Sequence, residues 1–158
     1  MKKLLFVCHG NICRSPMAEF VMKKIARDAA AEDVLHIESA ATSSEEIGNA
    51  VYPPAVRELA RHGICCEGKR ARRITPADFL HYDMIIVMED YNIRNMRSQP
   101  VGGGKVWKLL DFAGCCEKGE ATPLSGGDIS DPWYHGDFSA TYEEIERGCK
   151  GLFKYLGF

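Results

Sequence analysis

The chain has 158 residues, of which 46% are hydrophobic and 27% charged, with a formal net charge of −2 and a pI near 6.2. These values are ordinary for a soluble globular chain, and they exclude a protein held to nucleic acid by bulk positive charge. No stretch approaches the roughly 18 apolar residues that span a bilayer, so we expect no membrane partner.

The first predicted element is a buried strand at residues 3–8 (KLLFVC). The opening "MKKLLFV" has the two lysines and the apolar run of a secretory signal peptide. The apolar run ends at Cys8, however, and no small-residue cleavage site follows it. We therefore interpret this segment as the first strand of a sheet.

Strands and helices alternate along the rest of the chain. Strand patterns follow at 34–41, 84–89 and 105–110, and helical patterns lie at 16–30, 54–63, 76–83 and 142–157. The Gly-rich segments at 100–105 and 123–132 are predicted loops. This alternation predicts an α/β fold, a parallel sheet with right-handed crossovers, in a single domain that spans residues 1–158.

The loop between the first strand and the first helix carries the chemical signal. Cys8 ends the strand, and Ser15 with Pro16 marks the predicted helix start, where serine is a good capping residue. Backbone N–H groups converge at such a strand-to-helix turn, which suits it to bind an anion and to stabilise a thiolate. Arg14 offers a planar fork that matches two oxygens of a phosphate, and Gly10 permits a tight turn. The spacing therefore predicts a cysteine nucleophile aimed at a bound phosphate.

Spacing alone is weak evidence, since Cys66 and Arg72 are also six positions apart. That second pair has no buried strand before it and no Ser-Pro helix start after it, so we treat it as coincidence. The complete run from Cys8 to Pro16 between a strand and a helix is much more specific.

This run, "VCHGNICRSPMAE", resembles the phosphate-binding loop of low-molecular-weight protein tyrosine phosphatases. The segments "ATSS", "RHGI", "ARRIT", "DMIIVMEDYNIRNM" and "SDPWYHGDFSATYEEI" extend the resemblance over essentially the whole chain. It implies a single-domain α/β sandwich with a four-stranded parallel sheet. It also implies that Cys8 attacks phosphorus and that Arg14 clamps the equatorial oxygens. The phosphate-binding loop would comprise His9, Gly10, Asn11, Ile12, Cys13 and Ser15, with Asn11 bracing its backbone and Ser15 donating to the sulfur.

The departure of an aryl oxide from phosphorus also needs a proton, and one carboxyl group can serve first as acid and then as base. On residue type alone, Asp131 in "SDPWYHG" is a candidate whose alternative role is an ordinary Asp-Pro turn. The resemblance implies that Asp131 is the general acid. It further implies that Trp133 and Tyr134 line the substrate slot, although Trp133 is equally suited to anchor the loop.

Several positions depart from the family pattern. Glu45 stands where human-type relatives carry a bulky aromatic residue, and it would disfavour acidic flanks around phosphotyrosine. His9 replaces a small or apolar residue. A histidine that supports the loop asparagine in relatives is missing from "KRARRIT" (69–75), so either another residue or Lys69 supports Asn11. We interpret this basic cluster as a solvated face. Ile12 favours phosphotyrosine over phosphoarginine, because related phosphoarginine phosphatases carry threonine there.

Seven cysteines without an export signal favour reduced thiols in the cytoplasm. The resemblance implies that Cys13 forms a protective disulfide with the nucleophile under oxidation, and packing as a small apolar residue is its other role. The adjacent pairs at 65–66 and 115–116 lack metal-ligand spacing, so we expect no metal and no cofactor.

Taken together, the sequence predicts a cysteine-dependent protein tyrosine phosphatase that acts on phosphotyrosine-containing proteins as a monomer. Three alternatives share parts of the pattern. An arsenate reductase of this fold needs paired resolving cysteines after the third strand, and residues 84–100 contain none. A sugar phosphotransfer carrier needs neither Arg14 nor an Asp-Pro acid. A non-catalytic phosphate-binding module could lose Cys8 or Asp131, and both are present.

Overall fold

The structure is a computed structural model that describes residues 1–96, 105–115 and 118–158. Four strands form one parallel sheet in the order β2-β1-β3-β4, which confirms the predicted α/β fold with a four-stranded sheet. The strands are β1 (Lys2–Cys8), β2 (Leu35–Ala41), β3 (Met84–Val87) and β4 (Val106–Lys108). The α-helices are α1 (Arg14–Asp28), α2 (Pro53–Arg61), α3 (Pro76–His81), α4 (Asp90–Asn95), α5 (Pro132–His135) and α6 (Phe138–Tyr155). Two 3₁₀ turns are η1 (Glu32–Val34) and η2 (Leu109–Phe112).

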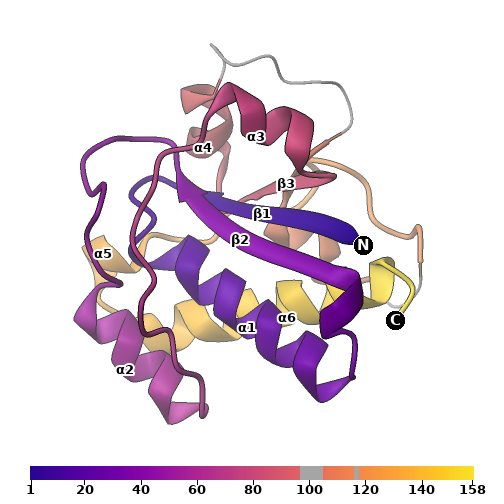
Figure 1. The fold of residues 1–158 in the computed structure, drawn as a ribbon, viewed down its shortest axis with the longest axis horizontal. Coiled ribbons are helices and arrows are strands. Elements are labelled where there is room, and N and C mark those ends of the chain that lie inside the picture. Colours follow the sequence, from indigo (N-terminus) through magenta and orange to yellow (C-terminus); the bar gives the residue numbers. More distant parts are fainter. Residues whose placement is uncertain (97–104, 116–117) are drawn as a thin grey trace.

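Helices cover both faces of the sheet. Helices α3 and α4 lie on one face, and α1, α2 and α6 lie on the other (Figure 1). Within β1, Leu4 and Phe6 pack toward α1 and α6, whereas Leu5 and Val7 pack toward α3 and α4. A strand that is buried on both sides has no polar face, which explains the continuous apolar run that opens the chain.

The element boundaries differ from the predicted ones mainly at the carboxyl ends of β3 and β4. The strand predicted at 84–89 ends at Val87, and the one predicted at 105–110 ends at Lys108, where the chain winds into η2. The last helix begins at Phe138 rather than at 142, because Asp137 caps it by accepting from Ala140 N at 2.9 Å. The loop predicted at 100–105 falls, apart from Lys105, outside the described residues.

The start of α1 corrects one prediction. The helix begins at Arg14, its N-cap is Cys13, and Ser15 lies inside the first turn instead of capping it. The hydroxyl of Ser15 lies 3.0 Å from the sulfur of Cys8. The hydroxyl of Ser15 therefore contacts the sulfur of Cys8 instead of capping the helix, although serine is a favoured capping residue.

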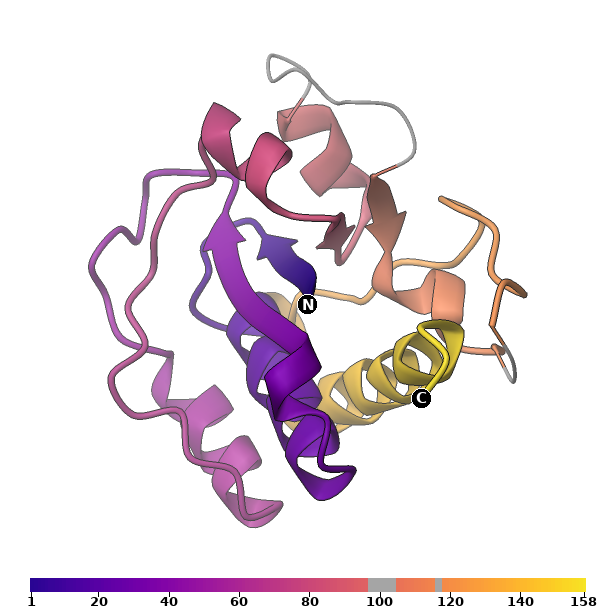
Figure 2. The same cartoon turned by 45° about the vertical axis from the view of Figure 1, so that its right-hand side comes forward.

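Helix α6 approaches the sheet closely through two glycines on one helical face. A Cβ atom on Gly151 would lie 1.7 Å from the carbonyl oxygen of Phe112, and one on Gly148 would lie 2.6 Å from the side chain of Leu109. Helix α6 packs along α1 and η2, as Figure 2 shows from the side. The two glycines thus fix the distance between the helical layer and the end of β4.

The topology places the carboxyl end of β1 at a switch point. The chain leaves β1 toward β2 on one side, whereas β3 pairs with β1 on its other side. Ligands of open α/β sheets bind at such a point, outside the carboxyl ends of the strands. Among the described residues, no helix is both long enough and apolar enough to cross a bilayer.

Candidate active site

Cys8 ends β1, and the loop that follows wraps around its sulfur. The backbone N–H groups of Asn11 and Ser15 point at the sulfur with N···S distances of 3.3 and 3.4 Å, and the hydroxyl of Ser15 lies 3.0 Å away. The first turn of α1 also directs its partial positive charge toward this point. Because these dipoles all favour negative charge, the loop is suited to hold an anion next to the sulfur of Cys8.

Asn11 holds the loop in an unusual conformation. Its φ angle is +60°, a left-handed value that asparagine tolerates better than most residues. Its side-chain Nδ2 donates to the hydroxyls of Ser15 at 2.8 Å and Ser39 at 2.9 Å, and its side-chain Oδ1 accepts from the backbone N–H of Arg72 at 3.2 Å. These bonds link the loop to β2 and to the segment before α3, so the bracing role expected for Asn11 has a geometric basis.

A buried ion pair between Lys69 and Glu19 supports Ser39, one of the residues that Asn11 contacts. The hydroxyl of Ser39 donates to Oε1 of Glu19 at 2.6 Å, and Glu19 is only 3% exposed. The ammonium of Lys69 lies 3.2 Å from the same carboxylate oxygen and donates to the carbonyl oxygen of Ser39 at 2.9 Å. The interpretation of residues 69–75 as a solvated basic face is therefore wrong for Lys69, which supports Asn11 through Glu19 and Ser39. It is also wrong for Arg72, which binds Asp78.

Arg14 lies almost fully buried beneath the site, with 1% exposure. Its Nη1 donates to the carbonyl oxygen of Ile129 at 2.8 Å, and its Nη2 donates to Glu89 at 3.0 Å and lies 3.3 Å from Oδ2 of Asp131. Burial works against the charge, but the negative charges of Cys8, Glu89 and Asp131 outweigh it and raise the pKa of Arg14. Its guanidinium is thus a permanent cation held in a fixed plane.

Asp131 reaches this place through the long segment that follows β4 and η2. Lys108, at the end of β4, forms an ion pair with Asp128 at 2.7 Å. The next backbone N–H, that of Ile129, donates to the carbonyl oxygen of Met88 at 2.9 Å. Asp131 itself caps α5, accepting from Trp133 N at 3.0 Å. The returning loop is therefore fastened to the carboxyl ends of two strands before it presents its carboxylate.

The mouth of the site is a cavity of about 750 Å³ that Cys8, Arg14 and Asp131 line together with aromatic side chains. Trp133 is half exposed, and its ring lies 4.7 Å from that of Tyr52. Trp133 thus both lines the cavity and anchors the loop, whereas Tyr134 is 86% exposed at the rim.

Glu45 lies on the cavity wall, and its Oε2 lies within hydrogen-bond distance of His9 Nε2, at 3.0 Å. Gly10 lies beneath the second acidic residue of that wall, because a Cβ atom there would come within 3.4 Å of Glu46. The cavity lining therefore carries the carboxylates of Glu45 and Glu46, and Arg94 lines the same cavity.

The remaining loop residues face inward. Ile12 and Cys13 are buried against Ala71. Burial, together with the nearby charges of Cys8 and Asp131, raises the pKa of the Cys13 thiol far above its ordinary value. Cys13 is therefore a neutral thiol in the resting protein.

Every site residue expected from the sequence lies in or directly beneath one cavity, but sequence reasoning missed some of their partners. Glu89 is the carboxylate partner of Arg14, and the Ile129 carbonyl oxygen fixes the other arm of its fork. Glu89 follows β3, the neighbour of β1, so the strand order could have indicated it. Within the described ranges, no group of three His, Cys, Asp or Glu side chains comes together as a metal site.

The fold and the site together define a class of protein. It is an α/β protein that places a cysteine sulfur and a buried arginine in one strand-to-helix loop, with a carboxylate brought in by a later loop. Residues 3–157 match the family described as low molecular weight phosphotyrosine protein phosphatase. The chain is 36% identical to the low molecular weight phosphotyrosine protein phosphatase of Gallus gallus, over 96% of this chain and 94% of that protein.

It is also 35% identical to the low molecular weight protein-tyrosine-phosphatase YfkJ of Bacillus subtilis, over 96% of this chain and 94% of that protein. The crystal structure of YfkJ superposes with a TM-score of 0.86 over 97% of this chain and 92% of that one, at 34% identity. That of SP-PTP from Streptococcus pyogenes superposes with a TM-score of 0.83 over 100% of this chain and 95% of that one, at 37% identity. The chain belongs to the low molecular weight phosphotyrosine protein phosphatase family.

Proposed function

We propose that this protein hydrolyses phosphotyrosine in protein substrates through a phosphocysteine intermediate on Cys8, with Asp131 as general acid and then general base. The observation that carries the proposal is the arrangement around Arg14. One guanidinium shares the cavity with the cradled sulfur and lies 3.3 Å from the carboxylate of Asp131. Nucleophile, oxyanion clamp and proton donor are thus close enough to act on one phosphate group.

In the first step, the thiolate of Cys8 forms a bond to phosphorus while the bond from phosphorus to the aryl oxygen breaks. Arg14 and the loop N–H groups stabilise the charge on the equatorial oxygens. Asp131 gives its proton to the departing aryl oxygen and so releases a neutral phenol.

In the second step, the carboxylate of Asp131 takes a proton from water as that water attacks phosphorus. The phosphorus–sulfur bond breaks, inorganic phosphate forms, and the electron pair returns to Cys8. The hydroxyl of Ser15, 3.0 Å from the sulfur, stabilises the thiolate as it leaves. No group beyond the protein and water is needed to balance the two steps.

The mouth of the cavity supports an aryl substrate. Trp133 and Tyr134 present exposed rings at the rim, which suits them to contact a phenyl group. Ile12 offers an apolar floor in place of the threonine that relatives acting on phosphoarginine carry. We further propose that the protein acts in the cytoplasm, since the described thiols of Cys8, Cys13, Cys65, Cys66 and Cys149 form no disulfide.

The test is a variant series assayed on p-nitrophenyl phosphate and on phosphotyrosine and phosphoarginine peptides. Cys8→Ser should abolish turnover of every substrate. Asp131→Asn keeps a capping side chain for α5 and should lower kcat by about 10²–10⁴-fold on phosphotyrosine, because the leaving group then departs unprotonated. Its effect should shrink on aryl phosphates whose phenol is a strong acid.

Robust turnover by Cys8→Ser, or an Asp131→Asn effect independent of the leaving group, would refute the mechanism. Preference for phosphoarginine would refute the substrate class. Thiol-dependent reduction of arsenate in place of hydrolysis would assign the reductase alternative.

A further inference from the structure

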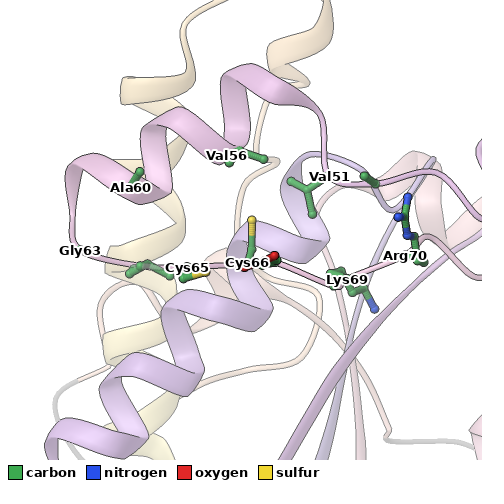
Figure 3. Close-up of a pocket in the computed structure, with 12 residues that line it drawn as sticks. Val51, Val56, Ala60, Gly63, Cys65, Cys66, Lys69 and Arg70 are labelled. Atoms are coloured by element: carbon green, nitrogen blue, oxygen red, sulfur yellow. The ribbon is translucent and has the colours of Figure 1, made fainter.

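A second cavity lies outside the site described above. It is a groove of about 560 Å³ between α2 and the segment 63–70, and it shares no lining residue with the active-site cavity. This volume falls within the roughly 300–1,000 Å³ typical of small-molecule sites. Figure 3 shows Val56 and Ala60 on α2, with the segment from Gly63 to Arg70 running along the opposite side.

The lining of the groove is mainly apolar. Val51 and Ile64 form buried parts of its wall, and Val56 leaves 39% of its surface exposed on α2. The exposed Cys65 and the buried Cys66 continue this wall. Apolar surface that faces water in a concave site favours an apolar occupant, because binding removes that surface from water.

The charged residues that line the groove indicate which polar group its ligand carries. The side chain of Arg70 lies at one end of the groove, is exposed, and has no ion-pair partner among the described residues. Lys69, beside it, is already paired with Glu19, and Glu67 contributes one exposed carboxylate farther along the segment. An unpaired guanidinium at the end of an apolar groove is complementary to a carboxylate with an apolar chain.

We propose that this groove is a binding site for a small monocarboxylate with an apolar chain, and that its occupancy strengthens oxyanion binding at the Cys8 loop. The carboxylate binds at Arg70, and the chain lies against Val56 and Ala60. The occupant is a small molecule, because the volume of the groove matches that of small-molecule sites.

The link to the catalytic loop is the segment itself. Lys69 lines the groove with its stem while its ammonium holds Glu19 and the Ser39 carbonyl oxygen. Three residues farther on, the backbone N–H of Arg72 donates to Oδ1 of the Asn11 side chain. A ligand that packs against this wall stabilises the arrangement in which Asn11 is held, and that arrangement is the one that presents the loop N–H groups to an oxyanion.

Calorimetric titration of the reduced protein with octanoate tests the site, with octanamide and acetate as matched probes that lack the charge or the chain. We expect saturable binding of octanoate, about fivefold weaker binding of octanamide and much weaker binding of acetate. Arg70→Gln should weaken octanoate binding about fivefold, the size of an exposed charge pair, and Val56→Asp should weaken it more than tenfold. Arg73→Gln and Val34→Asp change exposed residues of the same types outside the groove and should bind like the wild type.

The coupling is measured by repeating the octanoate titration in saturating phosphate. Because coupling is reciprocal, octanoate should bind about fivefold tighter with phosphate present, and phosphate about fivefold tighter with octanoate present. Equal octanoate affinity with and without phosphate would overturn the coupling.

Absence of saturable binding, equal binding of octanamide, or unchanged affinity in Val56→Asp would overturn the site. Peptide-resolved alkylation by iodoacetamide gives an independent readout, since octanoate should slow modification of Cys65 and leave Cys149 unaffected. None of these measurements depends on catalytic turnover, so they stand apart from the proposed phosphatase reaction.

Discussion

Replacing Lys69 with methionine tests whether the active-site loop depends on a buried ion pair beyond the catalytic residues. Methionine keeps most of the apolar stem of lysine and removes only the ammonium. The variant loses the contacts with Glu19 at 3.2 Å and with the Ser39 carbonyl oxygen at 2.9 Å. Glu19 keeps two partners, because the Ser39 hydroxyl still donates to Oε1 at 2.6 Å and Lys23 lies 2.7 Å from the other oxygen.

The expected loss can be worked out from these contacts. A hydrogen bond to a charged group contributes about 1.5–3 kcal/mol, and the remaining Lys23 offsets part of the penalty of leaving Glu19 buried. We therefore expect Lys69→Met to lower the free energy of unfolding by about 2–4 kcal/mol. At roughly 2–4 °C per kcal/mol for a chain of this size, the melting temperature should fall by about 5–15 °C.

Lys23→Met is the matched control. It removes the other lysine from the same carboxylate, but the side chain of Lys23 is 38% exposed, so its loss should cost about 1 kcal/mol or less. Urea unfolding of both variants gives the comparison, and phosphate inhibition of the residual activity reports on the loop. Lys69→Met should weaken phosphate binding, whereas Lys23→Met should not. Equal destabilisation and equal phosphate affinity in the two variants would refute the supporting role of Lys69.

Three further outcomes follow from the described contacts. Gly151→Ala should destabilise the fold by about 1–3 kcal/mol in urea unfolding, since its Cβ would lie 1.7 Å from a carbonyl oxygen of η2, and an unchanged midpoint would contradict this packing. Although burial opposes it, the hydrogen bond from Arg72 lowers the pKa of Asp78, so Asp78 stabilises the fold above the unfolded pKa and loses this effect as pH falls. Asp78→Asn should therefore destabilise more at pH 7 than at pH 3. Iodoacetamide should alkylate Cys8 well before Cys13 at neutral pH, because the raised pKa of Cys13 keeps it a neutral thiol, and equal rates in a peptide map would disprove that.

The sequence predicted those parts of the fold and of the candidate site that are formed by residues adjacent in the chain. Local patterns predicted the strand β1, the loop from Cys8 to Arg14 and the last helix. In each of these segments, residues close together in the sequence also lie close together in the structure. The short helices α4 and α5 span 6 and 4 residues, too few for a helical period to emerge, and neither was predicted from periodicity.

The support of the loop could not be predicted in the same way. Lys69 is 50 positions from Glu19 in the sequence, and its neighbours are charged, so a solvated face was the simpler interpretation. Only the tertiary structure brings the ammonium to a carboxylate that is 3% exposed. Ser15 shows the same limit in a local setting, because a preference for helix caps gives way when a buried sulfur offers its hydroxyl a partner.

Arg14 connects the loop that contains it with parts of the site that are far away in the sequence. It lies in the first turn of α1, yet its side chain binds Ile129, which is 115 positions later, and Asp131 just beyond it. Its guanidinium is planar, so fixing one arm on the Ile129 carbonyl oxygen and another on Glu89 also fixes the direction of the remaining N–H groups. In the proposed reaction, the same contacts therefore set both the position of the bound oxyanion and the position of the Asp131 carboxylate relative to it. A lysine could supply the positive charge, but its ammonium has no planar set of N–H donors with fixed directions. For that reason the site depends on an arginine beneath the loop.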